Sequence, residues 1–203
     1  MALDIFLADE AATIRFGEDM AMALRRGDYV ALSGDLGAGK STFSRALIRT
    51  IADDAFLEVP SPTFTLVQSY DLRIPVAHFD LYRIADAAEI DELGFDEALS
   101  DGICLVEWPE KGFGALPAEG ITLTFVHEGD GRRVSIDGPA PALARISRSL
   151  AIRAFLDGRG YRDAARRHLT GDASVRAYEH IHFGENRFVL MDSPRHTPGP
   201  ILA

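Results

Sequence analysis

The stretch LSGDLGAGKSTFSRAL, residues Leu32–Leu47, decides the fold that this chain can adopt. Within it, Gly34–Ser41 matches the pattern G-x-x-x-x-G-K-[ST] in full. The short apolar run YVALSG leads into it, and a helical pattern continues from about Ser41 to Ile51. A strand, a glycine loop and a helix in this order indicate a phosphate-binding loop. The glycines let backbone N–H groups converge on phosphate oxygens, and the helix N-terminus adds its positive end. The sequence therefore predicts nucleotide binding.

The composition indicates one hydrophobic core with a small appendage. The chain has 203 residues, 47% of them hydrophobic, and no apolar run approaches the roughly 18–20 residues of a membrane helix. The N-terminus MALDIFLADE has early acids and no basic segment, so we expect no secretory signal. The single Cys104 cannot form an internal disulfide, which fits a reducing compartment. These features predict a cytoplasmic protein that does not contact a membrane.

The net charge changes sign along the chain. Residues 1–140 hold 11 Lys and Arg against 25 Asp and Glu, a net charge of −14, whereas residues 141–203 hold 10 against 6, a net charge of +4. The acidic main body disfavours broad binding of nucleic acid by that body alone. Because the Pro- and Ala-rich stretch DGPAPALAR lies at the change, we predict a nucleotide-binding domain over 1–140 and an extension over 141–203.

Apolar spacing elsewhere predicts alternating strands and helices. Helices are expected over TIRFGEDMAMALRRGDY (13–29) and, with a capping-box-like start at Asp86 and Glu89, over DAAEIDELGFDEAL (86–99). Strands are expected at TFTLVQSYD (63–71), PVAHFDLYR (75–83) and GICLVEWP (102–109), and a hairpin at ITLTFVHEGDGRRVSIDG (121–138). This order predicts an α/β fold of the P-loop NTPase type. The mainly parallel sheet would be flanked by helices and have an antiparallel edge, with a small C-terminal extension added.

The glycine loop needs partners for catalysis. Lys40 is expected to reach the outer phosphates, and Ser41 offers a hydroxyl to Mg²⁺. A second acid usually follows a buried strand, and Glu107 directly follows the apolar residues ICLV. Asp80, among the aromatics of HFDLYR, is the next candidate. Spacing alone leaves other interpretations open: Glu107 as a solvated strand-end acid, and Asp80 as a helix cap or the partner of Arg83.

Several missing motifs narrow the class of nucleotide-binding protein. The chain has no guanine-specificity motif N-K-x-D and no D-x-x-G at the usual place of a GTPase switch, which favours adenine. It also has no arginine-rich lid segment of the kind that small-molecule kinases close over two substrates. His180 and His182 lie two residues apart with no third ligand nearby in the sequence, so we expect no metal site there.

Five motifs together resemble a known family. GDLGAGKST, SPTFTLV, HFDLYR and CLVEWPEKG, in this order and spacing, are similar to the TsaE family of bacterial P-loop ATPases. DEAATIRFG near the start resembles the N-terminal nucleotide-contacting segment of that family, and the resemblance covers about residues 4–140. It implies a role in making the threonylcarbamoyl adenosine at position 37 of tRNAs that read ANN codons. The resemblance also implies ATP and Mg²⁺ as cofactors and the TsaB–TsaD pair as partner. Contact with tRNA would come only through the complex with that pair, and ATP hydrolysis would be weak without the partner.

The resemblance also implies roles for individual residues. Ser41 and Glu107 would hold magnesium, Asp80 would lie near the γ-phosphate, and Lys40, Asp80 and Glu107 would form the catalytic set. The family usually has Thr where Ser41 stands, and the hydroxyl is retained. Ser61 and Thr63 match a motif close to the site without an assigned role. The nucleotide contacts would come from Thr13, Gly37, Ala38, Gly39, Lys40, Ser41, Thr42 and Trp108.

The C-terminal segment departs from that family. RISRSLAIRAFLDGRGY (145–161) predicts a helix, and the segment after it predicts two strands around a glycine turn. LTGDASVRAY followed by RFVLMDSP resembles the first hairpin of an aminoglycoside-phosphotransferase-like sugar kinase, whose catalytic Asp and Asn would lie well downstream. We interpret residues 141–203 as the incomplete beginning of such a kinase lobe, a truncated fusion. An unrelated extension is the alternative.

Three functions fit these observations. The first is an ATPase that drives or resets a tRNA-modifying assembly. The second is a P-loop small-molecule kinase with an unknown phosphate acceptor. The third is a nucleotide-sensing binding module without meaningful hydrolysis. The five motifs favour the first.

Overall fold

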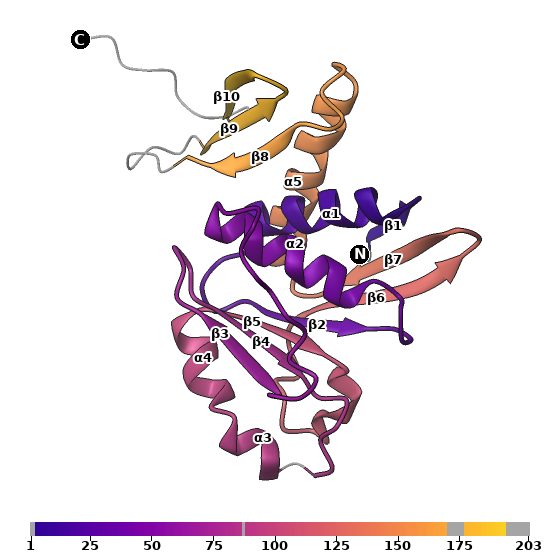
Figure 1. Cartoon of the computed structure of the whole chain (residues 1–203), viewed down its shortest axis with the longest axis vertical. Coiled ribbons are helices and arrows are strands. Elements are labelled where there is room, and N and C mark those ends of the chain that lie inside the picture. The colour runs from indigo at the N-terminus through magenta and orange to yellow at the C-terminus, as the bar shows by residue number, and fades with distance from the viewer. Residues whose placement is uncertain (1–2, 87, 170–176, 194–203) are drawn as a thin grey trace.

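A seven-stranded sheet forms the centre of the molecule (Figure 1). The computed structural model describes residues 3–86, 88–169 and 177–193. The strand order of the central sheet is β1-β7-β6-β2-β5-β4-β3. The four middle strands run parallel to one another: β6 (Ile121–Glu128), β2 (Tyr29–Ser33), β5 (Ile103–Glu107) and β4 (Val76–Asp80). The α/β fold with a mainly parallel central sheet is confirmed.

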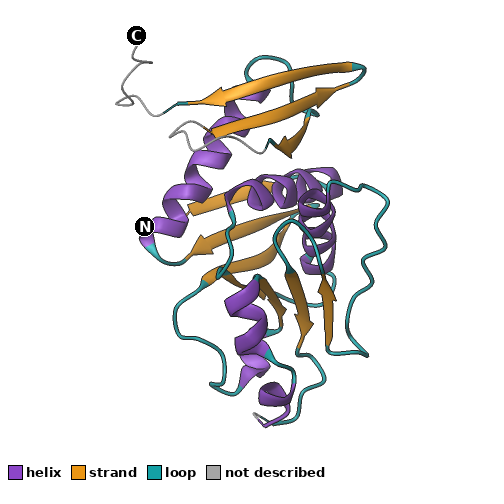
Figure 2. Cartoon of the chain, turned by 90° about the vertical axis from the view of Figure 1, so that its left-hand side faces the viewer, coloured by secondary structure: helices purple, strands orange, loops and turns teal. Residues whose placement is uncertain are grey.

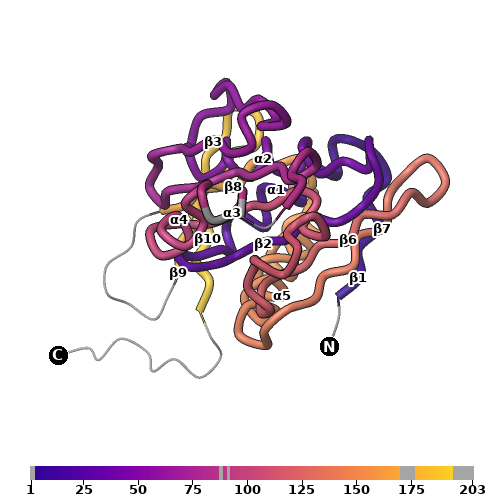
Figure 3. The backbone as a smooth tube through the Cα atoms, turned by 90° about the horizontal axis from the view of Figure 1, so that it is seen from below, coloured from indigo at the N-terminus to yellow at the C-terminus, as the bar shows by residue number. Residues whose placement is uncertain are grey.

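Both edges of the sheet are antiparallel, whereas the sequence predicted one antiparallel edge. On one side β7 (Gly131–Asp137) pairs with β6 and β1 (Leu3–Leu7) pairs with β7; on the other, β3 (Val67–Tyr70) pairs with β4. The predicted hairpin is confirmed, since Glu128 pairs with Gly131 across a two-residue turn. It extends to one side of the molecule beside β1 (Figure 3). β1 was not predicted, because LDIFL is too short to show a clear pattern.

Helices cover both faces of the sheet (Figure 2). On one face α1 (Glu10–Ala23), α2 (Lys40–Ala52) and α5 (Ala140–Asp157) share a core with residues from the strands, including Val30, Leu32 and Leu105. On the other, α4 (Phe95–Asp101) packs Phe95 against alternate residues of the same strands, including Cys104 and Val106. The central strands are apolar on both faces because both faces are covered.

A glycine sets the distance between α1 and α2. A Cβ atom at Gly17 would lie 2.8 Å from the Cβ of Ala46 and 2.9 Å from the carbonyl oxygen of Phe43. The ring centroids of Phe16 and Phe43 are 5.2 Å apart beside this contact. The two helices therefore pack at close range.

Two predicted elements are broken by local backbone geometry. The strand expected from Thr63 begins only at Val67, because Leu66 has φ of 64° and donates its N–H to the carbonyl of Pro62 in a turn. The helix expected over 86–99 divides into α3 (Ala88–Glu92) and α4 at Gly94, whose φ is 69°. Its predicted start is confirmed as a capping box, since the N–H of Asp86 donates to Glu89 Oε1 at 3.3 Å and the N–H of Glu89 donates to Asp86 Oδ1 at 3.4 Å.

The extension forms a second small sheet beyond α5 (Figures 1 and 2). The predicted helix is confirmed as α5, which begins earlier, at Ala140. β9 (Ala177–Phe183) and β10 (Asn186–Asp192) pair around Gly184, as predicted, and β8 (Ala165–His168) adds a third strand that was not predicted. Residues 170–176 of the kinase-like stretch LTGDASVRAY lie outside the described residues. The domain boundary at 140 stays a prediction.

A buried ionic cluster fastens the extension to α1. Arg166 is completely buried; its Nη1 donates to Asp19 Oδ1 at 2.7 Å, and its Nε and Nη2 donate to the two carboxylate oxygens of Glu179, each at 2.7 Å. Arg153 Nε donates to Asp19 at 3.0 Å, and Ser149 Oγ donates to the Asp19 carbonyl at 2.7 Å. Each guanidinium thus faces carboxylates in a buried or largely buried site.

These contacts explain the change of charge along the sequence. Arg145 binds Asp28 at 2.7 Å, Arg153 also binds Glu18 at 3.2 Å, and Arg167 binds Asp53 at 2.8 Å. Basic residues of the extension therefore neutralise acids of the main body. Within the described ranges no helix is both long and apolar enough to cross a membrane.

Replacing Arg166 by Leu should strongly destabilise the chain. The substitution leaves Glu179 and Asp19 buried with fewer donors, and breaking a buried ion pair costs about 3–5 kcal/mol in the free energy of unfolding. Urea titration followed by circular dichroism measures this change. The control is Arg15→Leu, which breaks the pair with the 75%-exposed Asp163 and should cost about 0–1 kcal/mol. Equal losses in the free energy of unfolding for the two variants would contradict a stabilising role of the buried ionic cluster.

Cys104 should be unreactive in the folded chain. It is buried in β5, and burial raises the pKa of its thiol to about 12, so the thiol stays protonated at neutral pH. A thiol reagent such as dithionitrobenzoate should label it only after guanidinium is added. Rapid labelling of the folded chain at pH 8 would show that β5 opens readily.

Candidate nucleotide-binding site

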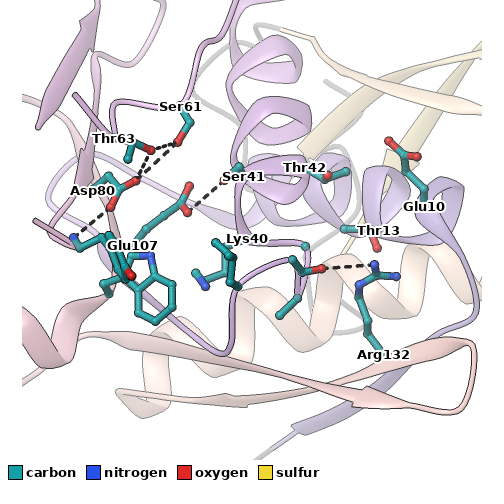
Figure 4. Close-up of a pocket in the computed structure, with 16 residues that line it drawn as sticks. Glu10, Thr13, Lys40, Ser41, Thr42, Ser61, Thr63, Asp80, Glu107 and Arg132 are labelled. Carbon is teal, nitrogen blue, oxygen red and sulfur yellow. Dashed lines mark hydrogen bonds between the residues drawn. The ribbon is translucent and has the colours of Figure 1, made fainter. Parts of the chain in front are cut away.

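A cavity of about 400 Å³ lies where β2, β4 and β5 end (Figure 4). Because these strands are parallel, residues distant in sequence meet at one edge of the sheet. In the register, Glu107 pairs with Leu32 on one side and with Asp80 on the other. All ten residues predicted for the site line this cavity: Thr13, Gly37, Ala38, Gly39, Lys40, Ser41, Thr42, Asp80, Glu107 and Trp108.

The glycine loop depends on backbone conformations that other residues rarely adopt. Gly34 has φ of 135°, and a Cβ atom there would lie 2.4 Å from the carbonyl oxygen of Phe125. Gly39 has φ of 109° and precedes α2, where the N–H of Phe43 donates to the Gly39 carbonyl at 2.9 Å. The loop therefore lies tight against β6, and the first N–H groups of α2 line the cavity.

Lys40 lies at the centre of the cavity, where it is only 4% exposed. Its Nζ donates to the carbonyls of Gly34 and Asp35, the latter at 3.0 Å, and lies 3.9 Å from the ring centroid of Trp108. Burial lowers the pKa of Lys40, whereas nearby carboxylates, of which Glu107 acts most strongly, favour the charged form. The ammonium group is therefore held in a site dominated by acceptors.

Ser41 and Glu107, the two predicted magnesium ligands, are in contact. Ser41 Oγ donates to Glu107 Oε2 at 3.0 Å. The other carboxylate oxygen, Oε1, lies 2.9 Å from Nε2 of the buried His78. Glu107 is thus not a solvated strand-end acid. His78 was missed, although strand alternation places it on the same face of β4 as Asp80.

Asp80 is held by hydroxyl groups. Its Oδ2 accepts a hydrogen bond from Thr63 Oγ1 at 2.8 Å and lies 3.5 Å from Ser61 Oγ, while its Oδ1 accepts the N–H of Tyr82 at 3.0 Å. The Ser61 and Thr63 hydroxyls are themselves 3.0 Å apart. The motif SPTF therefore supplies the groups that orient this carboxylate. Arg83, the partner considered from sequence, lies over the ring of Phe64 at 5.3 Å.

Trp108 has a left-handed backbone, which a non-glycine residue adopts at a cost. Its φ is 60° and its ψ is 50°, and its N–H donates to the carbonyl of Leu32 at 3.3 Å. The ring packs on Tyr82, with centroids 5.0 Å apart. The strained turn after β5 thus directs the indole toward Lys40.

The N-terminus of α1 closes another side of the cavity. Asp9 caps the helix by accepting the N–H of Ala12 at 2.7 Å, and Thr13 Oγ1 donates to the Asp9 carbonyl at 3.2 Å. Glu10 and Arg132 also line the cavity and were missed. Arg132 comes from β7, and no motif in the sequence connects that hairpin with the loop.

Comparison with known proteins decides the family. The family model described as "Threonylcarbamoyl adenosine biosynthesis protein TsaE" matches residues 7–134. The chain belongs to the TsaE family. The match ends before α5, so the extension lies outside it.

Individual relatives agree with this assignment to the TsaE family. The chain is 38% identical over 142 residues to the tRNA threonylcarbamoyladenosine biosynthesis protein TsaE of Haemophilus influenzae, covering 66% of this chain and 89% of that protein. It is 40% identical over 107 residues to the protein of the same name from Rickettsia felis, covering 52% and 62%. The crystal structure of YdiB from Bacillus subtilis has a TM-score of 0.62 at 25% identity and covers 76% of this chain and 97% of that one.

Proposed function

We propose that this chain binds Mg-ATP and hydrolyses it in support of threonylcarbamoyladenosine formation on tRNA. The contact of Ser41 Oγ with Glu107 Oε2 at 3.0 Å, beside the glycine loop, carries the proposal. Hydroxyl and carboxylate oxygens are ligands that Mg²⁺ prefers. The similar proteins from Haemophilus influenzae and Rickettsia felis, both tRNA threonylcarbamoyladenosine biosynthesis proteins, indicate the pathway.

The residues present fit magnesium that is bound together with a nucleotide. The described part of the chain holds no cluster of three or more His, Cys, Asp or Glu side chains suited to a metal ion. Mg²⁺ is commonly held by one or two carboxylates and by phosphate oxygens of the substrate. Ser41 and Glu107 would hold the ion from the protein side. When bound, it would draw negative charge from the phosphate oxygens.

The other residues of the cavity have distinct roles in this proposal. The amides from Gly37 to Thr42 bind phosphate oxygens, and Lys40 exchanges its carbonyl acceptors for an outer phosphate. Asp80, held by Thr63 and Ser61, orients the attacking water beside the γ-phosphate. Thr13 lies against the nucleotide at the N-terminus of α1.

The protein partner in this proposal is the TsaB–TsaD pair. The acidic main body leaves contact with tRNA to the complex, and the basic residues of the extension described above are largely paired within the chain. Hydrolysis is expected to be slow until the partner is bound.

Replacing Glu107 by Gln should raise the Mg²⁺ concentration that half-saturates the ATP-bound chain by more than about tenfold, because a neutral amide is a weaker ligand. Trp108 is the single tryptophan and lines the cavity, so its emission reports binding directly. Binding of ATP in EDTA should change little. Glu128→Gln, on the exposed hairpin, is the matched control. Unchanged Mg²⁺ dependence in Glu107→Gln would refute the assignment of this ligand.

The second experiment reconstitutes tRNA modification with TsaB–TsaD and this chain as the sole ATPase of its kind. Asp80→Asn should bind Mg-ATP yet lose turnover and modification by at least about a hundredfold, since it removes a water-orienting carboxylate. If the partners change neither turnover nor modification, the proposed function is wrong. Phosphoryl transfer to a metabolite in preference to water would identify a kinase instead.

A further inference from the structure

Arg132 lies at the opposite end of the cavity from Asp80 and Glu107 (Figure 4). Figure 4 shows Asp80 and Glu107 on one side of Lys40, and Arg132, Thr13 and Glu10 on the other. Arg132 comes from β7 and is part of the cavity lining. It therefore brings a permanent positive charge to an end of the site that Lys40 does not occupy.

The Arg132 side chain crosses the glycine loop in close contact. A Cβ atom at Gly39 would lie 3.2 Å from Arg132 Nε and 3.3 Å from its Cδ. Arg132 Nη2 makes a long hydrogen bond, 3.5 Å, to the carbonyl of Gly37. The absence of a side chain at Gly39 thus makes room for the guanidinium beside the loop amides.

The Nε–H of Arg132 is buried and has no hydrogen-bond partner among the described residues. A buried donor without an acceptor is unfavourable, so such a group in a cavity indicates a ligand that supplies one. The neighbouring Arg133 behaves differently: it points to the other face of β7, and its guanidinium donates two hydrogen bonds to Glu128, at 2.5 and 2.6 Å. The two arginines therefore form a natural pair of test and control.

We propose that Arg132 binds the inner phosphates of the nucleotide, those that ADP and ATP share. The inference rests on the proposed function, since it assumes a nucleotide in this cavity. With the outer phosphate at Lys40, and with Glu107 and Asp80 beyond it, a polyphosphate along the loop places its inner phosphates toward Thr42 and Thr13. A phosphate oxygen there would accept from Arg132, and the fork of N–H groups suits phosphate geometry.

The experiment measures binding of ADP, ATP and pyrophosphate to the full chain by calorimetry in EDTA, which removes any contribution of the metal ligands. Arg132→Gln should weaken all three ligands by the same factor, about ten- to a hundredfold, as expected for loss of a hydrogen bond to a charged group. Arg133→Gln should bind them like the wild type. Arg132→Lys keeps the positive charge but not the planar set of guanidinium N–H donors, so it should recover part of the lost affinity.

Other results overturn the inference. Weakening of ATP alone would place Arg132 at the outer phosphate, and weakening of both nucleotides but not pyrophosphate would place it at the nucleoside. Equal affinities for Arg132→Gln and Arg133→Gln, with matching melting temperatures, would leave Arg132 without a binding role. If the wild type binds no nucleotide, the proposed function fails first. If Arg132→Gln does not fold, the affinities of Arg132→Lys and Arg133→Lys for the same three ligands are compared instead: weaker binding by Arg132→Lys alone supports the inference, and equal affinities overturn it.

Discussion

The parallel pairing of β2 with β5 brings the glycine loop beside Glu107, and the rest of the site is arranged around this pairing. β2 leads into the loop and α2, so Ser41 lies at the start of that helix; β5 ends at Glu107, so the carboxylate meets the hydroxyl at 3.0 Å. β4 pairs with β5 on the far side and adds Asp80 in register with Glu107. Three segments separated by dozens of residues thus form one cavity because their strands run in one direction.

The residues on these strand ends were predictable from sequence, and those on the returning hairpin were not. The glycine loop is a contiguous motif, and Glu107 directly follows an apolar strand, so local patterns identified both. Arg132 reaches the loop only because β6 lies parallel to β2 and β7 returns antiparallel to β6, and this pairing leaves no mark around residue 132. His78 was missed for a related reason: a histidine in an apolar strand has no distinctive pattern until its neighbour across the sheet is known.

Backbone conformation accounts for two of the differences in the fold. Leu66 and Gly94 have positive φ values, which delay the start of a predicted strand and divide a predicted helix. The alternation of apolar residues continues through both positions, so periodicity does not reveal the turns. The ionic cluster could not be predicted from sequence either. The sequence shows an excess of acidic residues up to residue 140 and of basic residues after it, but it does not show that Arg153 and Arg166 both bind Asp19.

α1 links the two ends of this arrangement. Its first turn carries Glu10 and Thr13 at the cavity, and its later turns carry Glu18 and Asp19 at the ionic cluster. Fourteen residues of α-helix form a stiff rod of about 21 Å. The ionic cluster and the wall of the cavity at Glu10 and Thr13 therefore share one rigid support, so the anchorage of the extension helps to fix the position of that wall.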